Sequence, residues 1–170
     1  MRLAALRSKK TAVVAGAAVV GLPMIFLAQS GAAVGTTQSS ERTFMLTEQP
    51  GSFHFVDVPP MQKKRNTASP GDEVIFVNKL MKGSTQVGRA QAVCIVSRPG
   101  KDPHITAVCT GSFLLRGGQL TVATTASFTA STLDIAITGG TGKYEGASGQ
   151  VTAVNHPDGS STDTFHVILP

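Results

Sequence analysis

Short apolar stretches separated by turn residues make up most of the chain after residue 50. The stretches are rich in Val, Ile, Thr and Phe, and Gly, Pro, Asp and Asn lie between them, as in β-strands joined by turns. No segment carries the sustained 3.6-residue apolar period of an amphipathic helix. The pattern predicts eight strands: Gly51–Val58, Asp72–Lys79, Gln86–Ser97, His104–Leu115, Gln119–Thr125, Thr132–Thr138, Ala147–Val154 and Asp163–Leu169.

The predicted elements indicate an all-β domain. Eight strands with no helix to cover a sheet face favour closure into an eight-stranded antiparallel β-barrel. A two-sheet sandwich fits the same periodicity and stays open as the alternative. Residues 33–50 are polar and rich in Ser and Thr. We therefore expect a flexible leader over 33–50 and the barrel domain over 51–170.

The first 32 residues have the three parts of a secretory signal peptide. Four basic residues lie among the first ten, residues 11–28 carry no charge, and small residues follow. We expect cleavage near Ala32 or Ala33 and a secreted, extracellular domain that does not stay on the membrane. An uncleaved membrane anchor is the alternative, because the apolar stretch is close to the length that spans a bilayer.

Removal of this segment changes the charge of the protein. The whole chain carries +5, but residues 1–32 hold four of its fifteen basic residues and none of its ten acidic ones. The remainder is nearly neutral, and its one basic cluster, residues 63–65, has no aromatic neighbour for base stacking. We expect no nucleic-acid partner. The four histidines lack metal-ligand spacing and there are only two cysteines, so we expect no metal site. We also expect no cofactor.

The two cysteines are placed to form a disulfide across a hairpin. Directly opposed residues of an antiparallel hairpin have a constant sum of positions. Cys94 and Cys109 centre the turn between Lys101 and Asp102, inside the Pro- and Gly-containing segment 98–103. Opposed Cβ atoms lie about 4.5–5.5 Å apart, which can close to disulfide distance. Two buried thiols, or one catalytic thiol, are the alternatives.

Two expected strands carry an apolar stripe that ends in a polar residue. The stripes occupy alternate positions: Phe53, Phe55 and Asp57 on the first strand, and Val74, Phe76 and Asn78 on the second. If both stripes face the barrel interior, Asp57 and Asn78 enter an apolar pocket, which is the usual composition of a small-molecule site. The alternative is that Asp57 only ends a strand and Asn78 only opens a turn.

Four segments resemble the allene oxide cyclase and dirigent barrel superfamily. The sequence GDEVIFVNKL at 71–80 with GS at 83–84, and ITGGTGKYEGASGQV at 137–151, resemble plant allene oxide cyclases. The segment GRAQAVC at 88–94 is similar to both groups, and FHFVDV at 53–58 is similar to the opening strand of dirigent proteins. The resemblance is to a secreted, bacterial-type member. It implies an eight-stranded antiparallel barrel, usually a homotrimer, with the ligand inside.

The resemblance also implies roles for individual residues. Asn78 matches the cyclase asparagine that helps to hold a water at the epoxide oxygen, and Phe76 matches an aromatic residue of the pocket. Asp57 falls near the first-strand glutamate of the cyclases and on the acid of dirigent proteins. Asp134 matches a second acid of some dirigent proteins and is expected to bind ligand. Cys94 falls on the pocket cysteine of the cyclases.

Three functions are consistent with these residues. The first is a cofactor-free cyclase or isomerase that folds an apolar, unsaturated, oxygen-bearing molecule into a reactive conformer. Asp57 would then be a buried acid with a raised pKa, and Asn78 would stabilise a developing oxyanion. The second is a dirigent-like protein that orients reactive intermediates without chemistry of its own. The third is a secreted barrel with a structural role.

Overall fold

The computed structural model describes residues 39–59, 67–101 and 104–170, where all regular elements are strands. The expected signal peptide and the basic cluster at 63–65 lie outside these ranges. Within the ranges, no helix is long and apolar enough to cross a membrane. The strands are β1 (Ser40–Val56), β2 (Thr67–Ala68), β3 (Glu73–Lys82), β4 (Thr85–Arg98), β5 (Gly100–Lys101), β6 (Thr106–Leu115), β7 (Gly118–Ser127), β8 (Thr132–Gly142), β9 (Ser148–Asn155) and β10 (Ser161–Leu169).

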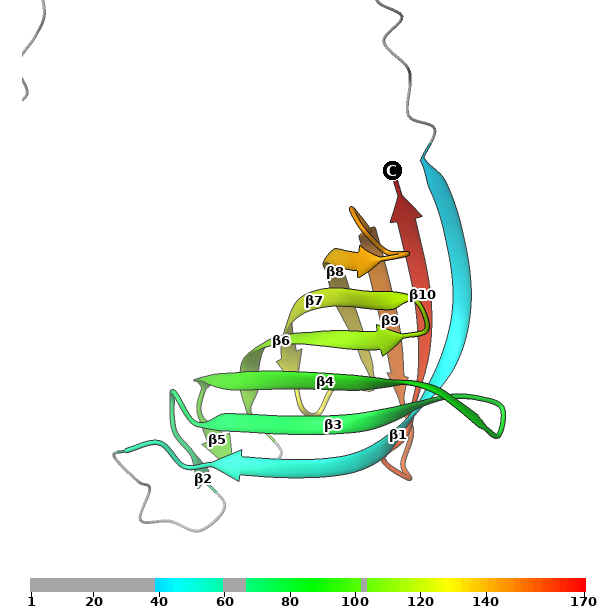
Figure 1. Ribbon diagram of the computed structural model, residues 1–170. Helices are drawn as coiled ribbons and strands as arrows, with labels where there is room; N and C mark the ends of the chain where they lie inside the picture. Colours follow the sequence, from blue (N-terminus) through cyan, green and yellow to red (C-terminus); the bar gives the residue numbers. More distant parts are fainter. Residues whose placement is uncertain (1–38, 60–66, 102–103) are drawn as a thin grey trace, which may run out of the picture. The chain divides into compact units, whose positions relative to one another are not determined.

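Eight of these strands close a barrel in the order β1-β10-β9-β8-β7-β6-β4-β3, and β2 and β5 pair as a small separate sheet. Every neighbouring pair in the barrel is antiparallel. Figure 1 shows β1 curving from the side of β10 to the side of β3. The predicted eight-stranded antiparallel barrel is therefore confirmed, and the sandwich alternative is wrong. Closure satisfies the backbone groups that an open sheet would leave at its edges.

Strand β1 is longer than the strand predicted over Gly51–Val58. Residues 40–50, for which the polar composition predicts a flexible leader, form its first part. They pair with β10, from Ser40 opposite Leu169 to Glu48 opposite Ser161. Local composition does not reveal this pairing, because the partner strand lies more than a hundred positions away in the sequence and most of the outward side chains are polar.

A β-bulge divides β1 into two parts. The register against β3 gains one residue between Gln49 and Ser52. A Cβ atom at Gly51 would lie 2.1 Å from a carbonyl oxygen of β3, so this bulge requires glycine. Because the extra residue inverts the alternation of side chains, Glu48 and Phe53 both face the barrel interior although they are five positions apart.

One end of the barrel is packed solid. Phe165 is fully buried there, stacks on Phe44 with ring centroids 4.7 Å apart, and meets the edge of Phe113 at 4.8 Å. The side chains of Leu80 and Leu120 are also fully buried in this cluster. The apolar ends of β1, β3, β6, β7 and β10 thus fill this half of the interior, and burial of these side chains supplies the main stabilising term of the fold.

The predicted disulfide between Cys94 and Cys109 is confirmed. The two residues lie directly opposite each other in the β4–β6 ladder, with their Cα atoms 4.0 Å apart. The residue numbers of each opposed pair have the same sum from Gly88–Leu115 to Val96–Ala107, as the predicted hairpin requires. The described residues contain no free cysteine, so neither alternative for the thiols holds.

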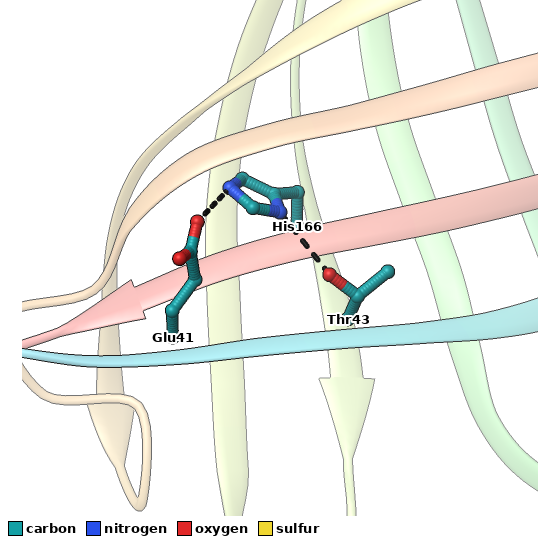
Figure 2. A network of polar contacts seen from close by, with 3 residues as sticks. All are labelled: Glu41, Thr43 and His166. Carbon is teal, nitrogen blue, oxygen red and sulfur yellow. Dashed lines mark hydrogen bonds and ion pairs between the residues drawn. The ribbon is translucent and has the colours of Figure 1, made fainter.

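Polar side chains lie on the outer face of β1 and β10 beside the exposed side chain of Met45. Figure 2 shows His166 of β10 between two β1 side chains: its Nε2 lies 2.5 Å from Oε1 of Glu41, and its Nδ1 lies 3.1 Å from Oγ1 of Thr43. Thr43 and His166 are opposed in the ladder and point away from the core. Their neighbours Phe44 and Phe165 point inward, so the two strands separate a hydrated outer surface from an apolar interior.

Candidate ligand-binding site

The other half of the barrel contains a cavity of about 490 Å³. Its volume is in the range of small-molecule sites. Small residues occupy many inward positions here, where the packed end has Leu, Val and Phe. They are Ala90, Ala92, Gly111, Ala126 and Ala153. These side chains are too short to meet across the barrel, and the space between them stays open.

Aromatic side chains surround the cavity. Phe76 of β3 contributes to its wall, and the disulfide of Cys94 and Cys109 contributes on the neighbouring strands. Phe53 and Phe128 also line it, with 65% and 36% of their surfaces exposed, so they present apolar rings to solvent near the loops. Such exposure is unusual for phenylalanine and is typical of a surface that an apolar ligand covers.

Two of the polar side chains that line the cavity, Glu48 and Asn78, form a hydrogen-bonded pair. The Nδ2 of Asn78 donates a hydrogen bond of 2.6 Å to Oε1 of Glu48. The backbone N–H of Gly51 donates to Oδ1 of Asn78 at 3.0 Å, which fixes the orientation of the amide. The bulge in β1 therefore has two roles: it turns Glu48 and Phe53 to the same side, and it orients the asparagine.

A second carboxyl group lies next to Glu48. Asp163 of β10 is buried, with 1% of its surface exposed, and lies opposite Leu46, two positions before Glu48. Its Oδ1 accepts a 2.6 Å hydrogen bond from Ser161 Oγ. Burial, and then the negative charge of Asp163, raise the pKa of Glu48 to about 8. Burial also raises the pKa of Asp163. The interior thus favours the protonated form of these acids.

This raised pKa makes stability depend on pH. Below about pH 4.5 the carboxyl of Glu48 is protonated in both the folded and the unfolded chain. Between that pH and about 8 only the unfolded chain ionises freely, so stability falls as the pH rises. We expect a loss of roughly 2 kcal/mol between about pH 5 and pH 9, less than the full ~1.4 kcal/mol per pKa unit because the cavity admits solvent.

Urea denaturation at a series of pH values measures this loss. Glu48→Gln should flatten the pH profile, whereas Glu145→Gln, in the exposed turn after β8, should leave it unchanged. A Glu48→Gln profile as steep as that of the unmodified protein would contradict the assignment of the raised pKa to Glu48.

The structure brings together some of the predicted site residues and not others. Of the predicted site residues, those that line the cavity are Phe53, Phe76 and Asn78. Phe55 and Val74 are opposed to each other on the inward-facing sides of β1 and β3 but lie outside the lining. Asp134 is exposed on the outer face of β8, where its Oδ1 accepts hydrogen bonds from Gln150 Nε2 at 2.8 Å and Thr152 Oγ1 at 2.9 Å.

Asp57 also lies outside the cavity lining. It follows the end of β1, and the N–H of the next residue, Val58, donates to Oδ1 of Asp72 at 3.0 Å. Asp72 is fully buried and also accepts hydrogen bonds from the N–H and hydroxyl of Ser69. Burial alone would raise the pKa of Asp72, but the hydrogen bonds from Ser69 and Val58 lower it. This anchor holds the chain after β1 at the start of β3.

Sequence reasoning missed Glu48 and Asp163. Both had a detectable signal, because each continues an alternating apolar stripe: Phe44, Leu46 and Glu48 on β1, and Asp163, Phe165 and Val167 on β10. Among the described residues, no cluster of three or more His, Cys, Asp or Glu side chains could hold a metal ion.

The fold and the cavity define a hollow antiparallel barrel with a polar pair of side chains inside. The sequence profile of the dirigent-like protein family matches residues 26–169. The chain therefore belongs to the dirigent-like family, in agreement with the resemblance found in the sequence. No curated protein sequence matches the chain.

Solved structures share this fold at low sequence identity. A pyocyanin demethylase is 21% identical, with 74% of this chain and 99% of that chain covered and a TM-score of 0.61. The pterocarpan synthase dirigent protein PsPTS1 is 18% identical over 78% and 95% of the two chains, with a TM-score of 0.56. The exo-specific intermolecular Diels–Alderase AbnU is 15% identical over 76% and 98%, with a TM-score of 0.54. These similarities concern the fold.

Proposed function

We propose that this barrel binds an uncharged, mostly apolar, unsaturated small molecule in its cavity and holds it in the conformer from which it cyclises or isomerises. The observation that carries the proposal is the cavity of about 490 Å³, whose wall is mostly apolar and whose polar side chains include the hydrogen-bonded pair Glu48 and Asn78. An apolar enclosure with few oriented polar groups binds small molecules and fixes their orientation. Fixing the reactive conformer accelerates an intramolecular reaction without a cofactor.

The family and the neighbouring structures support this proposal. The barrels that share the fold are named for a demethylase, a pterocarpan synthase dirigent protein and a Diels–Alderase. The dirigent-like family assignment supports a second candidate, in which the barrel orients a reactive intermediate that another enzyme generates. The two candidates use the same cavity and differ in whether the barrel alone produces turnover.

We also infer that the domain works outside the cytoplasm and as a homo-oligomer, with a homotrimer expected. The Cys94–Cys109 disulfide is typical of oxidising compartments. Exposed aliphatic side chains cover the outer faces of β4 and β6: Val93, Ile95 and Val108, with 39%, 49% and 50% of their surfaces exposed. Such a patch is typical of a surface that a second subunit covers.

A ligand screen with cavity variants tests the proposed function. The panel contains polyunsaturated epoxides, conjugated ketones and phenolic radical precursors, and binding is measured as a shift in melting temperature and as Kd. Phe76→Ala should weaken binding by about 10- to 100-fold, since burial of an aromatic ring contributes about 1.5–3 kcal/mol. Ala92→Leu should weaken binding because it adds bulk to the wall of the cavity. Native mass spectrometry of the exported protein identifies a bound molecule and gives the mass of the assembly.

The matched controls lie on the outer face. Lys79→Ala, next to the site residue Asn78, and Ala136→Leu, which adds the same bulk outside the barrel, should both bind as the unmodified protein does. Equal binding by Ala92→Leu would place the ligand elsewhere and overturn the proposal. Product formed by the barrel alone supports the cyclase or isomerase, whereas a changed product ratio only in the presence of a radical-generating oxidase supports the orienting role.

A further inference from the structure

The closure of the barrel does not extend along the whole of β1. Its pairing with β10 ends at Glu48 opposite Ser161, where β10 begins, whereas its pairing with β3 continues to Val56 opposite Glu73. In the barrel β1 has no neighbour besides these two strands. Figure 1 shows the second half of β1 at the border of the curved sheet that it forms with β3 and β4. Among the described residues, the edge of β1 over Ser52–Val56, here called the free edge, therefore has no strand partner.

The free edge carries exposed apolar side chains. Phe53 and Phe55 point to the inner face, opposite Phe76 and Val74 of β3, yet 65% and 46% of their surfaces are exposed. Phe53 lines the cavity and Phe55 does not, so a ligand in the cavity does not account for the exposure of Phe55. An unpaired apolar strand edge is a site at which another strand adds to the sheet.

The connection that follows β1 is too short to cover the free edge. The N–H groups of Val58, after the end of β1, and of Ser69, before β3, both donate to the carboxyl of Asp72. The chain thus leaves and returns at the same end of β1, and Thr67 already pairs with β5. Residues 59–66 are too few to run along the five residues of the free edge, turn and run back.

The N-terminal residues do not reach the free edge either. Strand β1 begins at Ser40, and Ser52 lies about 40 Å further along the strand. Residues 33–39, which precede β1 after the expected signal cleavage, extend over at most about 25 Å. A strand that pairs with the free edge therefore comes from another chain.

The sequence of the free edge is symmetric about His54, with a phenylalanine on either side. If two copies pair in antiparallel direction about a twofold axis at His54, Phe53 of each copy lies opposite Phe55 of the partner subunit. Such an axis keeps the inner faces of both strands on the same side, so the four rings form one surface. Aromatic side chains at opposed positions stabilise an antiparallel pair. The edge is therefore complementary to a second copy of itself.

We propose that two copies of this chain pair along their free edges, in the antiparallel register centred on His54, and that each copy completes the cavity wall of the other. Phe53 lines the cavity, so Phe55 of the partner subunit, opposite it, extends this wall. Pro50 and Pro59 have no N–H group and limit the ladder to the residues between them. The pairing does not depend on the proposed ligand, and its surface differs from the aliphatic patch of β4 and β6.

A cysteine at the centre of the register tests the pairing directly. In His54→Cys the two new thiols lie opposite each other, about 4.5–5.5 Å apart at Cβ, which can close to a disulfide. Both native cysteines are already bonded to each other, so each chain carries one thiol. Mild oxidation should convert most of His54→Cys into a covalent dimer, seen on a non-reducing gel. Asp134→Cys, also exposed on the outer face, should stay uncoupled. Equal coupling of both variants would overturn the proposal.

A charge exchange at the same position tests the symmetry. His54→Lys and His54→Glu each place two like charges opposite each other, and each should weaken association about tenfold in sedimentation experiments. An equimolar mixture of the two variants should associate again, because a lysine then faces a glutamate. Thr125→Lys, on the exposed outer face of β7, is the control and should associate as the unmodified protein does. Single variants that associate normally, or a mixture that does not recover, would contradict the register.

Hydrogen exchange locates the contact. The amides of Ser52–Val56 should become more protected when the protein concentration rises from about 1 μM to about 100 μM, and His54→Lys should remove this change. If association protects β4 and β6 but leaves the free edge unprotected, the copies meet elsewhere and the inference is wrong. It is also wrong if the free edge is protected only when a different protein is added, because a foreign strand then occupies it. Neither result affects the proposed ligand-binding function.

Discussion

Replacing Phe165 by Ala should lower the free energy of unfolding by about 3–5 kcal/mol, the range for removal of a fully packed aromatic ring. Phe165 has no exposed surface and contacts the rings of Phe44 and Phe113. Its removal leaves a void between the first and last strands of the barrel, which the surrounding backbone cannot close because both strands are held in the ladder. Urea or guanidinium denaturation measures the change.

A matched variant on the same strand controls for the loss of side-chain mass. Ile168→Ala removes a partly exposed outer side chain of β10 and should cost less than about 1.5 kcal/mol. A Phe165→Ala protein destabilised no more than the Ile168→Ala protein would mean that the packed end can collapse around the void. Phe165→Ala should also extend the cavity toward the packed end of the barrel. A higher affinity for the larger ligands of the panel would report this extension.

Removal of the disulfide should have the next largest effect. The double variant Cys94→Ala/Cys109→Ala is expected to lose about 3 kcal/mol, because the bond closes a loop of 15 residues whose conformational freedom it limits in the unfolded chain. The sulfur atoms also line the cavity, so the variant adds space to the ligand site. Denaturation curves with and without reductant measure the loss.

The control is chemical and needs no further variant. A reductant should destabilise the unmodified protein by the same amount and leave the double variant unaffected. Val108→Ala, next to Cys109 on the outer face, should cost less than about 1.5 kcal/mol. Equal stability of the oxidised protein and the double variant would show that the hairpin is held by its ladder alone.

The sequence predicts those parts of the fold in which local pattern and global structure agree. Strand β10 can be predicted from its own sequence, because every second residue is buried and this strict alternation is typical of a β-strand. The hairpin of Cys94 and Cys109 is set by a local turn. The first half of β1 is different, because its stability comes from pairing with β10 at the far end of the chain. Its own composition resembles that of a loop.

The same distinction between local pattern and long-range pairing explains which residues of the candidate site can be predicted from the sequence. Asn78 and Phe76 line the cavity, and regular alternation along β3 is enough to direct both side chains inward. The bulge at Gly51 shifts the alternation, so the inward position of Glu48 cannot be counted back along β1 from Phe53 without the register. The outward orientation of Asp134 can be predicted from the sequence. Leu133, Ile135 and Ile137 form the apolar stripe of β8, and alternation directs Asp134 to the opposite face.

The pairing of β1 with β10 sets the order in which the barrel can be completed. Ser40 pairs with Leu169, so the ring cannot close until the last strand has emerged from the ribosome or an export channel. Until then β1 and β9 each present an unpaired strand edge, which is a site for association with other chains. Because this final contact joins residues so far apart in sequence, closure is expected to be a slow step of folding. A molecular chaperone that covers strand edges would therefore act before β10 is available.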